Sequence, residues 1–261
     1  MSRTFLAILH FDGSGFVGWQ RQKAGRSVQG ECEAVLEKLN GRRIPVYAAG
    51  RTDAGVHARG MGVSLTVPAK WTAETLRRAL NALLPKDCWI ERMDEMSPGF
   101  HARKSATARR YHYLVGTDDG SASPFRRPYE WALARSLDRE ALSRGASDVL
   151  GIHDFRAFAA KGEAKPHYRC EVRTARWTDR DGTGVCFEIE ADRFLHHMVR
   201  FLVGTMVDMG LGRRPAEDMK DLLARSDNDE TSPPAPPQGL YFIAAEYPKE
   251  CFVDQREALH E

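Results

Sequence analysis

A single aspartate in a short loop of small residues is the group with the clearest potential for chemistry. Asp53 lies in the stretch 50–57 (GRTDAGVH), with Arg51 two positions before it and His57 four positions after it. Glycines on both sides of such a loop let the backbone approach a ligand closely. The carboxylate could act as a nucleophile or stabilise a developing cation, or it could bond its own backbone in an Asx turn. The loop by itself leaves both interpretations open.

The segments on either side of this loop have the pattern of strands. The apolar run 44–49 leads into it, and residues 60–67 leave it with alternating side chains. In the first half we also expect strands at 4–11 and 88–96, a helix capped by Ser27, and a helix over 72–84 followed by Pro85. In the second half we expect strands at 106–116 and 239–247 and a hairpin that pairs 169–179 with 185–192. We also expect helices at 138–150 and 195–211, and a short helix opened by Pro215.

Strands are thus interleaved with two main helices in each half of the chain. This predicts an α+β protein made of two ferredoxin-like, RRM-like halves, with helices packed on one face of the sheet. We place the halves at 1–105 and 106–261, the first carrying the aspartate loop. The last dozen residues are expected to pack loosely.

Composition restricts the class of protein. An apolar content of 42% with 28% charged residues is typical of a soluble globular protein, and the net charge of +2 favours no particular partner. The five cysteines form no C-x-x-C pair, so reduced thiols are expected rather than a zinc site or disulfides. The N-terminus has no signal-peptide core and no apolar run is long enough to cross a bilayer, which predicts a cytoplasmic protein without membrane contact.

Basic residues occur in clusters that could neutralise phosphates, although a solvated surface explains any one pair equally well. The clusters are Arg103 with Lys104, Arg109 with Arg110, Arg126 with Arg127, and Arg213 with Arg214.

The segment 13–18 (GSGFVG) formally matches the glycine pattern of a dinucleotide site. Such a site needs a helix that begins inside the motif and an acid after the next strand. Here the helix begins near Ser27, and Glu37, at the right distance, lies on that helix, so we reject this interpretation. We expect the segment 13–22, with exposed Trp19, Gln20 and Arg21, to contact RNA instead.

Two further positions attract attention before any family is considered. Tyr111 and Tyr113 alternate along one strand face and could be core residues or a stacking surface for a base. Arg200 lies in an otherwise apolar helical stretch, where a cation is costly unless it is paired. His196 and His197 precede it, and adjacent residues of a helix diverge by about 100°, so no metal site is expected there.

Six blocks, in one order along the chain, are similar to the TruA family of tRNA pseudouridine synthases. The blocks are GRTDAGVHA (50–58), FDGSGFVGWQRQ (11–22), FHARKSATARRYHY (100–113), GIHDFRAF (151–158), FLHHMVRFLVGT (194–205) and APPQGLYF (235–242). The resemblance implies a central mixed, mainly antiparallel sheet shared by the halves, an active-site cleft between them, and a homodimer. It also implies that uridines 38, 39 and 40 in the anticodon stem-loop of tRNA are isomerised without a cofactor.

The same resemblance implies roles for five residues. Asp53 would be the nucleophile, Arg51 would fill the space left by an everted base, and Tyr111 would stack on the uracil. Arg200 would pair with the catalytic carboxylate, and Leu240 would cover the apolar side of the base. The family usually has alanine where this chain has Pro237, which should stiffen the loop without removing a chemical group.

Three other functions remain open at this point. The chain could be a non-catalytic RNA-binding or RNA-chaperone protein on the same scaffold. It could be a related synthase that modifies a different RNA. It could also be a hydrolase that uses Asp53 with water and releases free uracil.

Overall fold

The computed structural model describes residues 1–161 and 167–253. Most of the terminal dozen that we expected to pack loosely therefore lies outside the described residues. Within those residues there are ten strands and five α-helices, which confirms the α+β class. None of the helices in this described part combines the length and apolar character needed to cross a membrane.

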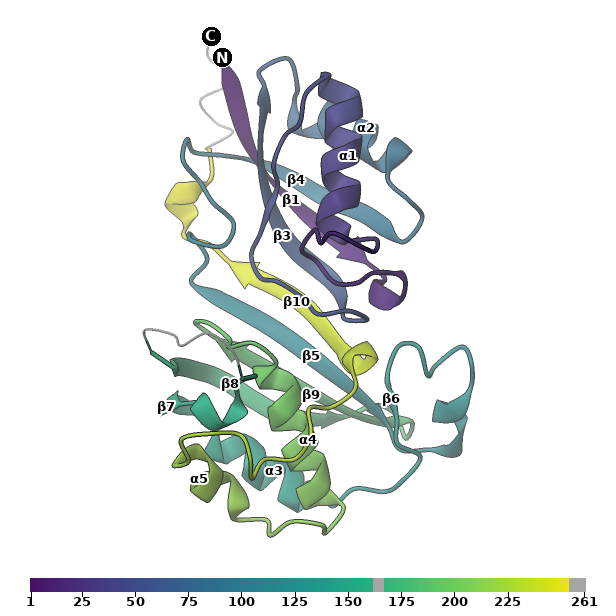
Figure 1. Cartoon of the computed structure of the whole chain (residues 1–261), viewed down its shortest axis with the longest axis vertical. Helices are drawn as coiled ribbons and strands as arrows, with labels where there is room; N and C mark the ends of the chain where they lie inside the picture. Colours follow the sequence, from purple (N-terminus) through teal and green to yellow (C-terminus); the bar gives the residue numbers. More distant parts are fainter. Residues whose placement is uncertain (162–166, 254–261) are drawn as a thin grey trace. The chain divides into compact units, whose positions relative to one another are not determined.

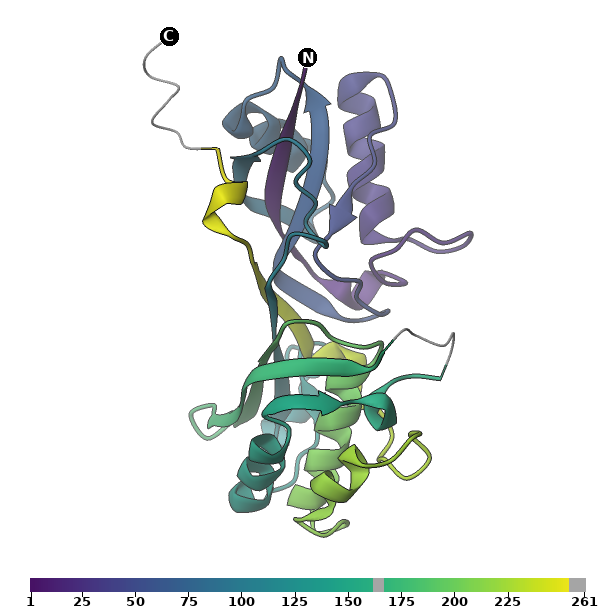
Figure 2. The ribbon, with the colours of Figure 1, turned by 90° about the vertical axis from the view of Figure 1, so that its left-hand side faces the viewer.

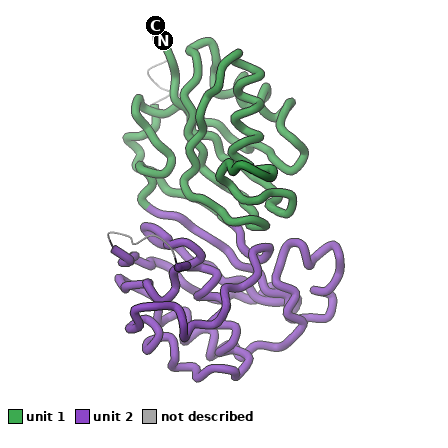
Figure 3. The backbone as a smooth tube through the Cα atoms, viewed as in Figure 1, with its two compact units in different colours: residues 1–107, 242–261 green, residues 108–241 purple. Residues whose placement is uncertain are grey.

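The chain divides into two compact units (Figure 3). Unit 1 comprises residues 1–107 and 242–261, and unit 2 comprises residues 108–241. This differs from the expected division at 105, because the C-terminal segment returns to the first unit. The difference has a local cause: the backbone oxygen of Glu246 accepts a hydrogen bond from Thr107, and Ile243 lies directly against Gly60.

Unit 1 is a sheet with two helices (Figure 1). Its strands lie in the order β4-β1-β3, followed by the end of β10, and β2 pairs with β3. The elements of this unit are β1 (Ser2–Phe11), α1 (Val28–Asn40), β2 (Tyr47–Ala48), β3 (His57–Pro68), α2 (Ala73–Leu83) and β4 (Cys88–Met96). β1 pairs antiparallel with both β3 and β4.

The alternation of side chains along β1 gives this sheet two buried faces. Leu9, Leu36 from α1 and Leu80 from α2 line one apolar space, so both helices cover the same face. On the opposite face Leu6 packs in a cluster with Phe100. Because successive strand residues point to opposite faces, a change of register by one residue would exchange the two cores.

Unit 2 places its helices on one side of its strands, as Figures 1 and 2 show for α3, α4 and α5 beside β7 and β8. The strand order is β5-β9-β8-β7, antiparallel throughout, and β6 adds a short parallel pair to β5. The elements of this unit are β5 (Ala108–Gly116), β6 (Trp131–Ala132), α3 (Arg139–Asp148), β7 (Gly151–Asp154), β8 (Arg169–Asp179), β9 (Gly184–Ala191), α4 (Met198–Gly210), α5 (Asp218–Leu223) and β10 (Leu240–Glu246), which continues into unit 1.

Close packing of α3 on α4 depends on small residues at the contact. A Cβ on Gly145 of α3 would lie 3.1 Å from the side chain of Met206 on α4. Met206 also accepts a hydrogen bond from the indole of Trp177 in β8, at 3.4 Å. Through these contacts of Met206, α4 packs against both α3 and the strand β8.

Three helices begin where the sequence predicts, and two begin at a different residue. Ser27, Thr72 and Asp138 each accept hydrogen bonds at the start of their helices. The expected start of α4 at 195 is wrong, because His197 adopts a left-handed conformation (φ 62°) and the helix begins at Met198. Pro215 does not open α5, which begins at Asp218 after a short turn.

Candidate active site

The aspartate loop of unit 1 is a tight turn whose geometry is set by its own backbone. The amide of Val56 donates to the carbonyl of Asp53 at 3.2 Å, and Gly55 between them has a positive φ of 78°. A left-handed conformation at that position favours glycine. Asp53 is half-buried, so the residue is not part of the closed core of unit 1.

The glycine-rich segment before α1 packs directly beneath this turn. A Cβ on Gly13 would lie 2.1 Å from the carbonyl oxygen of Val56, and one on Gly18 would lie 2.7 Å from that of Thr52. Gly18 also has a positive φ of 115° and forms a bridge with Asp53. These glycines therefore serve close backbone packing around the aspartate loop, which agrees with rejecting a dinucleotide site.

His57 anchors the end of the loop from within the core. Its side chain is 2% exposed. Its Nδ1 accepts a hydrogen bond from the amide of Gly13 at 3.1 Å, and a carboxylate oxygen of Asp12 lies 3.2 Å from the same nitrogen. The contact joins the first residue of β3 to the glycine segment, so His57 contributes to the position of Asp53.

The side chains expected to contact RNA near this loop differ in exposure. Trp19 is 3% exposed and packs on Phe11 at a ring distance of 6.3 Å, so its expected exposure is wrong. Its backbone amide also donates to the carbonyl of Thr52 at 3.0 Å, which attaches this segment to the aspartate loop. Gln20 and Arg21 are exposed, as expected. Arg51 is exposed too, and it makes no hydrogen bond or ion pair with any residue that the structure describes.

In unit 2, Tyr111 lies in β5 opposite Ile189 of β9. Its ring is 8% exposed and makes an edge-to-face contact with Phe194, with centroids 5.0 Å apart. That contact fixes the plane of the tyrosine ring. Tyr113, on the same face, is fully buried and is a core residue, as the sequence also allowed.

Tyr113 connects β5 to the proline-rich segment that precedes β10. Its hydroxyl donates to the carbonyl of Pro236 at 2.7 Å, and a Cβ on Gly239 would lie 2.7 Å from its ring. Burial raises the pKa of Tyr113 well above its ordinary value, while the charge of Arg200 acts in the opposite direction. The hydroxyl is therefore a neutral donor at physiological pH.

Arg200 fixes the same segment from α4. Its Nε donates to the carbonyl of Ala235 at 2.7 Å, and the amide of Ala235 donates back to the carbonyl of Arg200 at 2.9 Å. A Cβ on Gly204, one turn later, would lie 2.2 Å from the carbonyl oxygen of Pro233. The segment thus lies tightly on α4, and it leads through a 3-10 turn beginning at Pro237 into Leu240, which is 6% exposed.

The two histidines before α4 do not occupy a helix. Their rings are 3.9 Å apart and tilted, with His196 exposed and His197 half-buried at the left-handed position. The helical divergence that argued against a metal site therefore does not apply to them, and the expectation that they bind none stays a prediction. A left-handed conformation at a residue other than glycine is uncommon and occurs often at functional positions.

Several of the basic clusters are neutralised by nearby carboxylates. Partners of the arginines are Glu190 for Arg110, Asp118 and Glu130 for Arg126, Asp208 for Arg213, and Asp218 for Arg214. Lys104 and Arg127 are exposed and have no such partner among the described residues. The clusters are therefore weaker candidates for phosphate contact than their sequence spacing indicated.

The sequence-derived site residues fall into two groups. Asp53 and Arg51 share one loop of unit 1, whereas Tyr111, Arg200 and Leu240 belong to unit 2. Within unit 2, Arg200 and the segment leading to Leu240 are brought together by the contacts with Ala235. The sequence did not reveal the positioning roles of Gly13, His57 and Tyr113, since a buried glycine or aromatic residue looks the same whether it supports a site or only a core.

Comparisons with known proteins identify the family of the chain. The family model described as tRNA pseudouridine synthase matches residues 7–103 and 146–248. A protein of Moorella thermoacetica named tRNA pseudouridine synthase A is 40% identical over 92% of this chain and 97% of its own length. Proteins of the same name from Myxococcus xanthus and Geobacillus kaustophilus are 40% and 37% identical, over 89% and 97% of this chain and 87% and 98% of their own lengths. The chain therefore belongs to the tRNA pseudouridine synthase family.

Proposed function

We propose that this protein isomerises uridine to pseudouridine at positions 38, 39 and 40 of the anticodon stem-loop of tRNA, with Asp53 as the nucleophile. The observation that carries the proposal is the half-buried carboxylate on a turn held by close backbone packing, in a chain that belongs to this family. Such a turn can present the two carboxylate oxygens of Asp53 to a substrate without rearrangement. Positioning the reacting groups in advance lowers the activation barrier of the reaction.

The chemistry requires only one charged group at the sugar. The bond from the ribose C1′ to N1 of the base breaks, the base turns, C1′ joins C5, the proton on C5 is lost and N1 gains one. The atoms balance without a redox partner or a group donor, so no cofactor is required. Aspartate has an ordinary pKa of about 3.9 and is anionic at neutral pH. It can attack covalently or stabilise the cationic sugar, and both a sugar ester and a glycal remain open as the intermediate.

Access to the base requires that the nucleotide leave its stack. Arg51 is suited to this step because its guanidinium is exposed and has no partner among the described residues. A planar cation can occupy the space of a missing base and contact phosphate. We assign Arg51 this role, which links base eversion to the loop that carries the nucleophile.

The residues of unit 2 would receive the everted base. The ring of Tyr111 is fixed by Phe194 and would stack on the uracil, and Leu240 would cover its apolar side. Arg200, half-buried at the start of α4, would pair with the catalytic carboxylate and keep it ionised. The cleft that would bring these residues to Asp53 remains a prediction of the proposal.

Recognition of three neighbouring positions is best explained by RNA shape and flexibility rather than base sequence. A homodimer would let one subunit hold the body of the tRNA while the other acts on the stem. The activity would place the protein in the cytoplasm, where its substrate is found.

Asp53→Asn tests the proposal with the smallest change of shape. We expect purified variant protein to form no pseudouridine in tRNA transcripts, while the tRNA dissociation constant stays within about threefold of wild type. The matched control is Asp181→Asn, an exposed turn residue with φ 44°, where asparagine is equally accommodated. Pseudouridine formation by the Asp53 variant at the wild-type rate would refute the assignment.

The open alternatives give different products in the same assays. A hydrolase would release free uracil. An RNA-binding protein without catalytic function would support growth equally well with either residue at position 53. A synthase for another RNA would leave tRNA positions 38 to 40 unmodified in a reconstituted reaction. Each of these results would replace the proposed function.

A further inference from the structure

The loop between β5 and β6 exposes an aromatic side chain to an unusual degree. Phe125 is 86% exposed, and Tyr129, four residues later, is 42% exposed. Arg127, between them, is exposed as well. Singly exposed apolar side chains are common on protein surfaces, so this exposure is informative only together with the fixed turn and the neighbouring cation.

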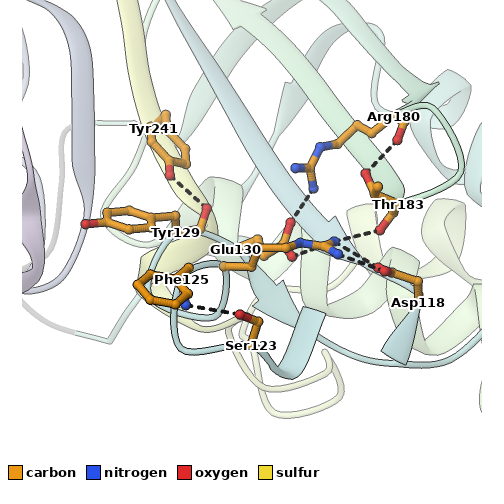
Figure 4. Close-up of polar contacts among 9 residues, drawn as sticks. Asp118, Ser123, Phe125, Tyr129, Glu130, Arg180, Thr183 and Tyr241 are labelled. Carbon is orange, nitrogen blue, oxygen red and sulfur yellow. Dashed lines mark hydrogen bonds and ion pairs between the residues drawn. The ribbon is translucent and has the colours of Figure 1, made fainter. Parts of the chain in front are cut away.

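This loop is held firmly from within by an ion-pair network (Figure 4). Glu130 is 2% exposed, and its carboxylate oxygens form ion pairs with the guanidinium nitrogens of Arg126 at 2.8 Å and of Arg180 at 2.6 Å. Arg126 also contacts Asp118 at 2.7 Å, and these hydrogen bonds lower the pKa of the Asp118 carboxyl. Because Arg126 bridges the two ends of the loop, the loop has a fixed base.

The tip of the loop is fixed by its own backbone. The amides of Arg126 and Arg127 both donate to the carbonyl of Ser123, at 3.0 and 2.9 Å. The Ser123 hydroxyl accepts from the amide of Phe125 at 3.3 Å. On the other side, the hydroxyl of Tyr241 donates to the carbonyl of Tyr129 at 2.7 Å (Figure 4). The exposure of Phe125 is therefore a consequence of a well-bonded turn.

Charge at the tip favours an anionic partner. Asp118 and Glu130 are neutralised by the arginines of the network, whereas the guanidinium of Arg127 makes no hydrogen bond or ion pair with any described residue. A free guanidinium two residues from an exposed phenyl ring is the combination that binds single-stranded nucleic acid: the ring stacks on a base and the cation contacts the backbone.

We infer that the loop 117–130 of unit 2 is a second RNA-contacting element besides the aspartate loop of unit 1, in which Phe125 stacks on an accessible base of the tRNA and Arg127 contacts phosphate. The inference rests on tRNA being the substrate, but it does not depend on which residue is the nucleophile. RNA is favoured over a protein partner because the cation at the tip is unpaired and the enzymes of this family are named for tRNA.

Phe125→Ala and Arg127→Gln test the surface through equilibrium binding of full-length tRNA to the intact protein. Loss of one base–aromatic stack should weaken binding roughly 5- to 150-fold. Loss of one phosphate contact should reduce the slope of log K against log salt by about 0.7 to 0.9. The control is Ile152→Ala, which removes another apolar side chain of unit 2, 59% exposed on β7, and should leave tRNA affinity unchanged.

Two results would overturn the inference. The first is an unchanged tRNA dissociation constant for both variants, with circular dichroism showing that each is folded. The second is a smaller sedimenting species for Phe125→Ala protein without RNA, which would identify the surface as a contact between protein chains. Failure of the proposed nucleophile is seen separately, because Asp53→Asn is read by pseudouridine formation and these variants are read by binding.

Discussion

Replacement of Gly13 by alanine should disturb the aspartate loop without touching the aspartate. A Cβ at this position would lie 2.1 Å from the carbonyl oxygen of Val56 and 2.5 Å from its carbonyl carbon. Real Cβ contacts are essentially never below 3.0 Å, so the loop would have to move by about 0.9 Å. Val56 donates to the carbonyl of Asp53, and the displacement would therefore reach the carboxylate. Misplacement of reacting groups by about 1 Å can cost about 100-fold in rate.

The assay is single-turnover pseudouridine formation at saturating tRNA, with urea denaturation run beside it. We expect the rate to fall about 100-fold, and the stability to fall by about 1 to 3 kcal/mol, the usual cost of overpacking. Gly15→Ala is the matched control, since a Cβ there meets nothing nearer than 3.6 Å in the same short segment. A folded Gly13→Ala protein with the wild-type rate would show that the position of this loop does not control the chemistry.

Three further predictions concern the supporting structure, two from substitutions and one from alkylation of the unchanged protein. Tyr113→Phe removes a buried hydrogen bond to Pro236 and should lower the free energy of unfolding by about 1 to 3 kcal/mol in urea titrations; an unchanged value would contradict the role of that bond. Ser27→Ala removes the N-cap of α1 and should lower the free energy of unfolding by about 1 kcal/mol in the same measurement, whereas a value equal to wild type would argue against a stabilising role of the cap. Burial raises the pKa of Cys88 to about 12 and that of Cys186 to about 11, so both thiols should stay protonated at about pH 8 and resist iodoacetamide until the protein is unfolded. Mass spectrometry of the alkylated native protein would detect the opposite result.

Much of the regular structure could be predicted because each element carries its own periodic or capping signal. The bounds of β4 and β8 match their alternating segments, and Ser27, Thr72 and Asp138 cap the helices that follow them. β6 has only two residues and β7 only four, so an alternation of apolar and polar side chains cannot be recognised in them. α4 begins late because His197 takes a left-handed conformation, and nothing in its side chain signals that choice.

The candidate site was predictable only in part, for a related reason. The small-residue loop in the sequence indicated Asp53 as a candidate. A glycine, however, gives the same sequence signal whether it allows a ligand to approach the backbone or allows two backbone segments to pack closely. The glycines before α1 prove to pack against the backbone of the loop, and Trp19, expected at the surface, is buried. Ion pairs formed across the sheet, such as Arg110 with Glu190, join residues far apart in the sequence, so clusters of basic residues overstate the free positive charge.

Mapping of pseudouridines in cellular tRNA, in a strain whose only copy of the gene encodes Asp53→Asn, tests the proposed activity most directly. The chemistry assigned to the aspartate loop predicts unmodified uridine at positions 38, 39 and 40, with pseudouridines elsewhere in the same tRNAs retained. Normal pseudouridine at those three positions, or a loss confined to sites outside the anticodon arm, would contradict it.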